Sequence, residues 1–436
     1  MPRSPQLETG DKREIQSSHS HYRWVILGVI FLILFLAVSS RGIVTMYVRP
    51  WSSEFGWSIT AITLAMSIQL IFSGPGGILG GSLTDRFGPK YVLMAYLLLI
   101  VIGIFGIAAM NGLWQLYLFY GLFLGIGSML HPVTTPLIAR WFSKGRGLAL
   151  GMVQEGDLLG MAVLAPFLLM INETSGWRTA WLGMGLATLV VVLPSTWIFI
   201  KPLQARTSTG AKTTNPVMKQ QGATFSQASK SRSFWMLMVS TLFCGVTARY
   251  FWLLIAPIAL EGGMSQTQVG LTISIAGFMA VPGMLVFGFA CDRISRPMLL
   301  SINFMLRCVA FIIMAFYIWT HEPVLMFIGA GMAGFLTRSS APPFSVAWIN
   351  CFGFRSIGSI LGISSTVHQT AAALSLFIAG YIFDRVGSYL PTLISSAVLL
   401  VIVSIVAWRI PEKKCYVETP EVIQPEKAQR LVTNAP

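Results

Sequence analysis

Charge is scarce in this sequence. Asp, Glu, Lys and Arg together make up 11% of its 436 residues, whereas a soluble globular chain carries roughly a quarter. A chain with so little charge is unsuited to a large folded surface in water and to a disordered state. The composition therefore excludes a soluble enzyme, a disordered protein and a nucleic-acid-binding protein. The net charge of +14 would otherwise suggest a polyanionic partner, so the positions of the basic residues need their own explanation.

Groups that carry catalysis or hold cofactors are also few. The five cysteines show no metal-ligand spacing, and we assign them no chemistry. The sequence contains no recognisable nucleophile–base pair, metal cluster or Walker phosphate-binding loop, which argues against an enzyme and against ATP-driven pumping. We therefore expect no cofactor and no metal. The first 22 residues lack the pattern of a signal peptide, so we expect the first hydrophobic run to remain as an uncleaved span.

Hydrophobic residues make up 54% of the chain and fall into twelve runs. Each run has the length of about 20 residues that a helix needs to cross the hydrocarbon core. Lipid offers the backbone no hydrogen-bond partners, so each run is predicted to be helical. The sequence thus predicts an all-α membrane protein with twelve transmembrane helices. The runs cover residues 24–48, 59–82, 90–110, 114–139, 147–171, 179–200, 234–258, 268–290, 297–320, 324–350, 356–382 and 389–410.

The predicted domain boundaries follow from one long polar interval. Residues 201–233 are rich in Gly, Ser, Thr, Gln and Lys, which is typical of a flexible linker. The interval separates six runs from six others. We therefore expect an N-terminal tail (1–23), an N-terminal six-helix bundle (24–200), the linker, a C-terminal six-helix bundle (234–410) and a C-terminal tail (411–436).

The basic residues predict the orientation in the membrane. Of the 30 Lys and Arg residues, three fall in the loops on one side and four within the runs, and the rest lie in the tails, the linker and the loops on the other side. Cytoplasmic loops carry the excess of Lys and Arg. We therefore expect a multi-pass protein in the lipid bilayer with both termini in the cytoplasm. The absence of a signal-peptide pattern favours the inner, cytoplasmic membrane.

The two halves of the chain resemble each other. At an offset of 207 residues, polar and helix-breaking positions recur as identities, which chance does not readily produce in apolar helices. The two bundles are therefore predicted to be pseudo-symmetric, and such transporters place the substrate near the midplane between the halves. The matching pairs include Glu54 and Glu261, Ser58 and Ser265, Pro75 and Pro282, Gly81 and Gly288, Asp85 and Asp292, and Arg86 and Arg293.

One loop carries a family resemblance. Residues 81–90, GSLTDRFGPK, resemble the signature loop between helices 2 and 3 of the major facilitator superfamily, and residues 288–296, GFACDRISR, are its degenerate copy. Finer features resemble the monocarboxylate-transporter and oxalate/formate-exchanger branch. These are EFGWS at 54–58, RWF at 140–142, RGLA at 146–149 and GWR at 176–178. The resemblance spans the whole chain and implies the superfamily's twelve-helix transporter fold and the monomeric state that is usual in it.

The same resemblance implies that these loops form a conformational latch on the cytoplasmic side. Asp85 can face the positive end of a neighbouring helix, and Arg86 lies where cytoplasmic charges belong. Gly81 and Gly88 permit close packing and a tight turn. The copy contributes Asp292 and Arg293. A plain solvated turn is the alternative interpretation.

Ionisable residues within the runs need a functional reason, because each costs roughly 2.5–3.5 kcal/mol at mid-helix on insertion scales. With neutral histidines, the arginines outnumber the acids by four to two. A cavity with this surplus of positive charge favours an anionic occupant. The residues are Arg41, His131, Glu155, Asp157, Arg249, Arg307, Arg338 and His368.

Five basic residues are predicted to bind the substrate. The repeat pairs Arg41 with a position next to Arg249, and His131 with Arg338; a register near 211 pairs Asp157 with His368. In the superfamily these helices line the central cavity. Arg338 is the strongest candidate, because it lies deep in its helix beside a helix-breaking proline pair.

Each of these residues has a structural alternative. Arg41 could snorkel to the outer interface, and the aromatic residues after Arg249 could anchor that helix there. His131 precedes Pro132 and could satisfy a freed carbonyl. For Arg307, a peripheral position favours a structural salt bridge or snorkelling over a role in the cavity.

Glu155 and Asp157 are predicted to serve proton coupling. They lie two residues apart, about 200° around a helix, so we expect only one of them, Asp157, to face the cavity. Asp157 then pairs with an arginine or carries a proton, while Glu155 bonds a neighbouring helix. His368 is an alternative proton carrier. Both acids depart from the branch, which has small residues at these positions.

The function predicted from the sequence is secondary active transport by alternating access. The substrate is a small organic anion, a carboxylate in the first instance, moved together with protons. Because helices 8 and 11 lack the branch's usual carboxylate-binding residues, the substrate is expected to differ from simple lactate or oxalate. The alternative is an exporter or exchanger of a zwitterionic or metal-chelating metabolite, favoured by the mixed charges of Asp157, Glu155 and Arg249. A transporter-like receptor is disfavoured by the short tails.

Overall fold

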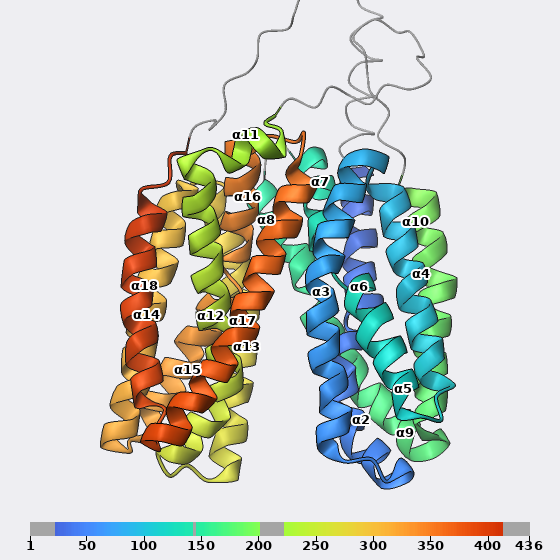
Figure 1. Cartoon of the computed structure of the whole chain (residues 1–436), viewed down its shortest axis with the longest axis horizontal. Coiled ribbons are helices and arrows are strands. Elements are labelled where there is room, and N and C mark those ends of the chain that lie inside the picture. The colour runs from blue at the N-terminus through green and yellow to red at the C-terminus, as the bar shows by residue number, and fades with distance from the viewer. Residues whose placement is uncertain (1–21, 143–144, 201–221, 413–436) are drawn as a thin grey trace, which may run out of the picture.

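The computed structural model describes residues 22–142, 145–200 and 222–412, and the regular structure in these ranges is helical. The helices stand side by side in two groups (Figure 1). Eleven of the described helices are long and apolar enough to cross a membrane. A further long helix, α17 (Ile357–Val386), carries Ser, Thr, His and Gln in its middle and supplies the twelfth predicted span. The predicted all-α membrane fold is confirmed.

The first group, the N half, comprises residues 22–200 and contains six spans. Its fifth and sixth spans are joined through α9, where Gly176 has a φ of +81° at the sharp turn between them. Its elements are the span Tyr22–Val48 with η1 (Ile33–Val38), α2 (Ser40–Phe55), α3 (Ile59–Phe87), α4 (Pro89–Ala108), α5 (Leu113–Leu116), η2 (Tyr117–Leu124), α6 (Gly125–Gly127), α7 (His131–Trp141), α8 (Arg146–Gln154), α9 (Gly156–Ala187), η3 (Thr188–Val192) and α10 (Leu193–Phe199).

The second group, the C half, comprises residues 222–412. Part of the segment predicted as linker is helical, since a short helix and the first residues of the seventh span lie before residue 234. The elements are α11 (Phe225–Ser229), α12 (Arg232–Glu261), α13 (Gln266–Cys291), α14 (Arg296–Thr320), α15 (Pro323–Thr337), α16 (Ala341–Phe352), α17 and α18 (Leu390–Trp408).

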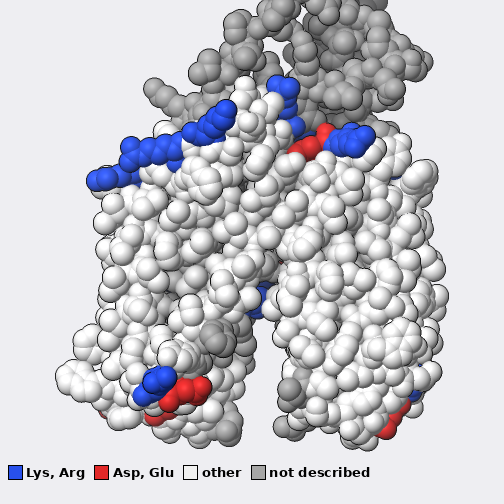
Figure 2. Space-filling view, viewed as in Figure 1, with Lys and Arg blue, Asp and Glu red and all other residues white. Residues whose placement is uncertain are grey.

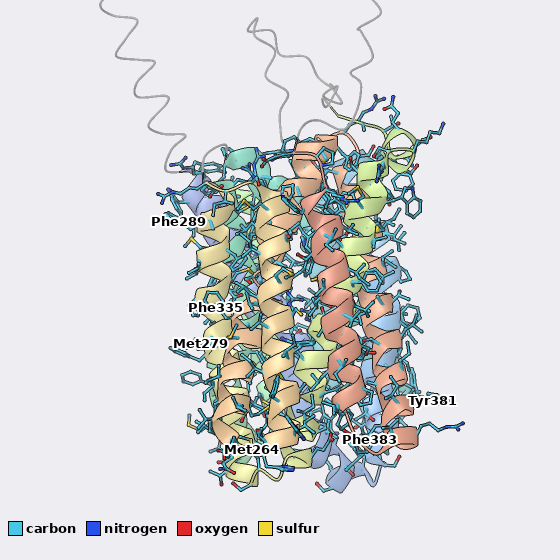
Figure 3. All side chains as sticks on the ribbon, turned by 90° about the vertical axis from the view of Figure 1, so that its left-hand side faces the viewer. Met264, Met279, Phe289, Phe335, Tyr381 and Phe383 are labelled. Carbon is cyan, nitrogen blue, oxygen red and sulfur yellow. The ribbon has the colours of Figure 1, made fainter. Side chains whose placement is uncertain are left out.

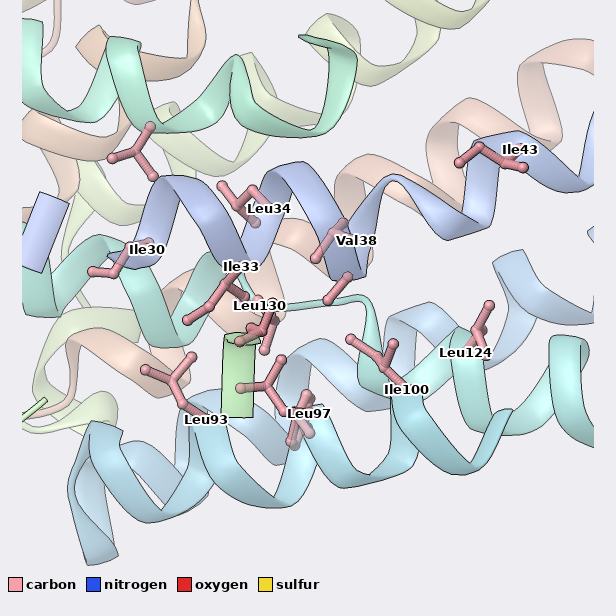
Figure 4. Packing of buried hydrophobic residues seen from close by; sticks show 14 of the residues in the cluster. Ile30, Ile33, Leu34, Val38, Ile43, Leu93, Leu97, Ile100, Leu124 and Leu130 are labelled. Atoms are coloured by element: carbon pink, nitrogen blue, oxygen red, sulfur yellow. The ribbon is translucent and has the colours of Figure 1, made fainter. Parts of the chain in front are cut away.

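Each half has its own apolar core. In the N half, Ile30 and Ile33 of the first span are buried on the side that faces Leu93 and Leu97 of α4 (Figure 4), while Leu34 lies on another side, next to Gly156 of α9. This interdigitation fixes the first span against the third. Burying each large side chain contributes about 1.5–3 kcal/mol in water, but in lipid the packing contacts themselves hold the helices together.

The outer surface of the bundle is apolar. In the C half, Met279 of α13 and Tyr381 of α17 lie at opposite margins of the bundle (Figure 3) and are exposed. Many other large apolar side chains are exposed in the same way, among them Phe278 and Trp319. A surface of this kind would aggregate in water and is suited to lipid.

The two halves are in contact from one end of the bundle to about the middle of their helices and are apart at the other end. We call the end where α3 finishes and α8 begins the tail face, and the opposite end the cleft face. Near the tail face α3 packs along α17 and α8 packs along α13. Figure 2 shows basic side chains gathered on the tail face and a cleft between the halves that opens on the cleft face. Basic atoms are visible at the inner end of this cleft. The structure is therefore closed at the tail face.

The cleft face carries a polar clamp in each half. In the N half, Glu54 accepts hydrogen bonds from Trp177 and from Arg178, the latter at 2.7 Å. In the C half the repeat partner Glu261 accepts from Ser388 and from the Tyr389 backbone N–H. Each clamp ties the end of the half's first span to the start of its sixth.

The clamp in the N half predicts a pH-dependent contribution to stability. Burial raises the pKa of Glu54, but the hydrogen bonds from Arg178 and Trp177 outweigh it and hold the pKa below 4.5. The stabilisation is therefore present above pH 4.5 and is lost as the pH falls through the lowered pKa. Because the Glu54 side chain is 41% exposed, we expect Glu54→Gln to cost less than about 1 kcal/mol.

Thermal unfolding of the purified protein at neutral and at acidic pH measures this contribution. Glu54→Gln should lower the melting temperature at neutral pH and match the wild type in acid. Glu173→Gln, which changes an exposed glutamate on the same face, is the matched control. An equal loss at both pH values would show that the Glu54 carboxylate does not act through its charge.

Candidate functional site

Three charged residues, Arg41 and Asp157 of the N half and Arg338 of the C half, meet where the two halves face each other. Asp157, in the first turn of α9, accepts from Arg338 Nη2 at 2.7 Å and from Arg41 Nη2 at 2.9 Å, and each arginine uses a different carboxylate oxygen. The side chains of Arg41, Arg338 and Asp157 are 34%, 29% and 14% exposed. The ion pair expected between Asp157 and an arginine is present, and Asp157 pairs with two arginines; its predicted position facing the cavity stays a prediction.

A broken helix positions Arg338. The tenth predicted span is split into α15 and α16, and Arg338 lies at the break, just before Pro342 and Pro343. The fourth span breaks at the equivalent place, between α6 and α7, where His131 lies. Prolines lack the N–H that would continue the helix, so these breaks follow from the local sequence.

Arg307 supports the broken helix from behind, and the salt bridge expected for it is absent from the described residues. The side chain is 0% exposed and donates to the Leu336 carbonyl at 2.8 Å, the Thr337 carbonyl at 3.3 Å and Asn303 Oδ1 at 3.0 Å. The C-terminal carbonyls of α15 thus act as its counter-charge. A guanidinium satisfies several carbonyls at once, whereas a salt bridge would need a second buried charge.

Glu155 departs from its predicted position. We expected it to point away from the cavity, but its Oε1 lies 3.5 Å from Arg338 Nε. The chain is interrupted there, since α8 ends at Gln154 and α9 begins at Gly156, so the angle of an ideal helix does not apply. The Glu155 side chain is 2% exposed, and neither of its oxygens accepts a hydrogen bond from a described residue.

Arg249 is a cation of the site without a counter-ion among the described residues. It is half-buried in α12 and close enough to Arg41 for the two charges to repel each other. Among the described residues, no ion pair or hydrogen bond of its side chain is found. Tyr250 and Phe251 are buried, so they pack within the half and do not anchor the helix at the membrane interface.

The two histidines lie in the same region. His131 Nδ1 is 2.6 Å from Thr135 Oγ1, so the ring bonds the next turn of its own helix. His368 of α17 lies beside the buried thiol of Cys244, and its backbone packs closely on Gly245 of α12. Both rings are close enough to feel each other's charge. Neither makes an ion pair within the described ranges.

Two aspartates join the halves at the tail face. Asp85, near the end of α3, accepts from the backbone N–H groups of Gly358 and Ser359 at 3.0 and 2.8 Å, at the start of α17. Its repeat partner Asp292 accepts from the N–H groups of Gly147 and Leu148 at 2.9 and 3.2 Å, at the start of α8. Each carboxylate faces the positive end of a helix of the other half, as expected for Asp85.

The other predicted latch residues have different positions. A Cβ on Gly81 would lie 1.9 Å from the Gly358 carbonyl oxygen, so Gly81 allows the close approach, and Gly88 has a φ of +83° in the turn before α4. Arg86 and Arg293 are exposed, and each lies over a phenylalanine ring of its own segment. These arginines therefore bear on the surface charge of the tail face.

Several polar contacts of the site were not predicted from the sequence. Tyr120 donates to the backbone carbonyl of Arg41 at 2.9 Å, and Arg338 donates to the Gln154 carbonyl at 3.0 Å. Thr366 of α17 donates to the Gly74 carbonyl of α3 at 2.7 Å. Backbone carbonyls are present at every residue, so the sequence carries no signal for which of them will accept.

Comparison with known proteins identifies the family. A family model described as the Major Facilitator Superfamily matches residues 30–261 and, in a second match, residues 237–430. The two matches together cover most of the chain and overlap within α12.

Curated relatives match over most of their length. The probable sulfoacetate transporter SauU of Cupriavidus necator is 26% identical, with 89% of this chain and 93% of that protein covered. Monocarboxylate transporter 12 of Mus musculus is 22% identical, with 84% of this chain and 80% of that protein covered. The resemblance to the monocarboxylate-transporter branch is thereby confirmed.

A solved structure shares the fold. FucP, a transporter of the same superfamily from E. coli solved in the outward conformation, superposes with a TM-score of 0.69 at 16% identity. The match covers 88% of this chain and 97% of FucP. At this identity the match shows a shared arrangement of the helices and nothing about the substrate.

Proposed function

Because the chain belongs to the Major Facilitator Superfamily, we propose that it moves a small organic anion, a carboxylate or sulfonate, across the membrane by alternating access together with a proton. Arg249, Arg338 and Arg41 form the anion site, with His131 and His368 in its wall. The tail face is cytoplasmic, in the inner membrane of the cell. The structure is closed to that side and open to the other.

The unpaired state of Arg249 is the observation that carries this proposal. A charge inside a membrane protein is costly unless it is paired or serves a ligand. Arg41 and Arg338 already share Asp157, whereas Arg249 has no acidic partner among the described residues. An oxyanion that enters the cleft supplies the missing charge. The named activities of SauU and of monocarboxylate transporter 12 belong to organic anions of this kind.

Glu155 and Asp157 divide the work of proton coupling. Asp157 is held by two arginines and stays ionised, so it is the poorer proton carrier. Glu155 is buried, accepts no hydrogen bond from a described residue and has only Arg338 nearby as a counter-charge. When Arg338 turns toward a bound anion, the Glu155 carboxylate loses that neighbour and takes up a proton, because burying an unpaired charge is costly.

The tail-face aspartates form the conformational latch. Asp85 and Asp292 hold the halves together through helix N-termini, and each such interaction contributes about 0.3–2 kcal/mol. Gly81 allows the close contact with α17 and Gly88 the turn after α3, while Arg86 and Arg293 add positive charge to the cytoplasmic surface. The latch is modest enough to open in every transport cycle.

The alternative substrate is a zwitterionic or metal-chelating metabolite that is exported or exchanged. The acids beside Arg338 favour it, since Asp157 could receive the cationic group of such a compound. Transport that needs a counter-substrate and no pH gradient would select this alternative.

A thermal-shift screen of the purified protein identifies the substrate class. Carboxylates, sulfonates, amino acids and nucleosides are compared at pH 5.5 and 7.5, because a ligand that binds the folded state raises the melting temperature. We expect stabilisation by one class of anion, stronger at the lower pH. The stabilising anion then serves as the substrate in uptake assays with proteoliposomes. Stabilisation by cations or neutral solutes alone would contradict an anion site.

Arg249→Ala should lower uptake of that anion about 10- to 100-fold, because a hydrogen bond to a charged group contributes about 1.5–3 kcal/mol. Arg249→Lys should keep part of the activity. The matched control is Arg385→Ala, which removes an exposed arginine at the end of α17. Wild-type uptake by Arg249→Ala would remove the main support for the proposal.

Glu155→Gln should abolish the acceleration of uptake by an inward pH gradient, because the amide cannot carry a proton. Exchange of the anion between equal concentrations on both sides should persist, since it needs no net proton movement. Both rates are measured with proteoliposomes. A gradient response equal to that of the wild type would assign the proton to another residue, with His368→Gln as the next variant.

Asp85→Asn should weaken the closure of the tail face by the loss of one charge–dipole interaction. Cys291 reports on this closure, since it is 0% exposed and a Cβ on Gly147 of α8 would lie 3.2 Å from its Sγ. We expect a severalfold faster reaction of Cys291 with N-ethylmaleimide, measured by mass spectrometry. Asp384→Asn, at an exposed aspartate near the cleft face, is the control. An unchanged rate in Asp85→Asn would contradict the latch.

A further inference from the structure

We propose that Asp157 is the resident counter-ion of the anion site and that it locks the halves together while the site is empty. The anionic group of the substrate displaces Asp157 from Arg338 and thereby releases the lock. This inference rests on the proposed function for the identity of the displacing ligand. The lock itself is a property of the ligand-free protein.

The lock is the ion pairing between the halves. Arg338 belongs to the C half, whereas Asp157 and Glu155 belong to the N half. The other ion pairs of the described residues join groups within a single half: Arg41 with Asp157, Arg178 with Glu54, and Arg296 with Glu412. Among these ion pairs, those of Arg338 must therefore break when the two halves separate.

The N half occupies the Arg338 guanidinium at several atoms. Nη2 donates to Asp157 Oδ1 at 2.7 Å and to the Gln154 carbonyl at 3.0 Å, and Nε faces Glu155 at 3.5 Å. A substrate oxyanion that binds Arg338 head-on must therefore replace Asp157. This exchange leaves no charge unpaired, because Asp157 keeps its hydrogen bond to Arg41 through Oδ2.

Arg249 makes this exchange possible. It lies near Arg41 and has no partner within the described ranges, so an incoming anion can bind there first without competition. When the anion then also binds Arg338, it lies between Arg249 and Arg338. Asp157 lies between two arginines in the same way in the ligand-free protein. A ligand with a planar carboxylate or a sulfonate fits this role, since two of its oxygens can face two guanidinium groups at once. A neutral solute cannot displace Asp157.

Release of the lock weakens the closure of the tail face. Arg338 lies at the break between α15 and α16, and α16 packs on α8 near the tail face. With the ion pair broken, the two charge–dipole contacts of Asp85 and Asp292 remain as the main polar ties between the halves. Binding of the anion thus shifts the population toward opening at the tail face, because the ligand interacts differently with the two states.

The experiment uses the native thiol Cys291 in the purified, full-length, ligand-free protein. Its reaction rate with N-ethylmaleimide is compared between the wild type, Asp157→Asn, Arg338→Gln and the double variant. Cys308, buried within the C half, is the internal control for folding. We expect each single variant to raise the Cys291 rate about tenfold with the Cys308 rate unchanged, the effect of one charged hydrogen bond on a two-state population.

The double variant shows whether the two single variants act through one shared bond or independently of each other. If Asp157 and Arg338 act through their mutual bond, the double variant reacts no faster than either single variant. Asp157→Glu, which keeps the charge, should stay near the wild-type rate. Wild-type rates in both single variants, or rates that multiply in the double variant, would overturn the lock.

A second arm adds sulfoacetate as the probe anion. It should raise the Cys291 rate of the wild type and leave that of Asp157→Asn unchanged, because that variant is already released. A variant effect on Cys291 without any response to sulfoacetate or to the stabilising anion of the thermal-shift screen would contradict the proposed substrate class and leave the lock standing. The failures of the two proposals are therefore distinguishable.

Discussion

The cost of placing charge inside a membrane is the constraint on which this structure depends. Each ionised group of the described spans has a physical justification. Asp157 is neutralised by two arginines and Arg307 by the carbonyls at the end of a half-helix; Arg249 has no acidic partner among the described residues, and we propose that a ligand supplies one. The proposed anion site therefore rests as much on a missing counter-charge as on the residues present.

The small number of charged groups also explains how the two halves can be held together by few polar contacts and can separate when these contacts break. At the tail face, Asp85 and Asp292 bind helix N-termini through the repeat symmetry, and close backbone packing replaces side-chain bulk. At the site, one arginine reaches across to two acids. Few, individually modest bonds between the halves fit the proposed alternating access, in which these bonds break and re-form in each cycle.

Much of this arrangement was predictable from particular residues. The prolines after His131 and Arg338 indicate broken helices, and both breaks are present. The repeat places Asp85 and Asp292 equivalently, and they cap equivalent helices. Two expectations need correction in detail. Arg307 has a structural role, but it binds carbonyls and forms neither a salt bridge with a described residue nor a snorkelling contact. Glu155 contacts a neighbouring helix as expected, but it contacts the same Arg338 as Asp157, because the helix is interrupted beside it. Neither backbone carbonyls nor a local interruption without proline leaves a residue pattern to recognise.

The sequence by itself determined the membrane class, the twelve spans and the set of buried charges, because lipid constrains composition and length so strongly that local pattern suffices. The duplication also determined which positions are equivalent. Only the tertiary structure decided which groups pair. It shows that Asp157 binds two arginines from different halves, and that Arg249 binds no acidic group among the described residues. It also shows that the halves close at the tail face. Pairing depends on distances between helices far apart in the chain, and a linear pattern holds no record of those distances.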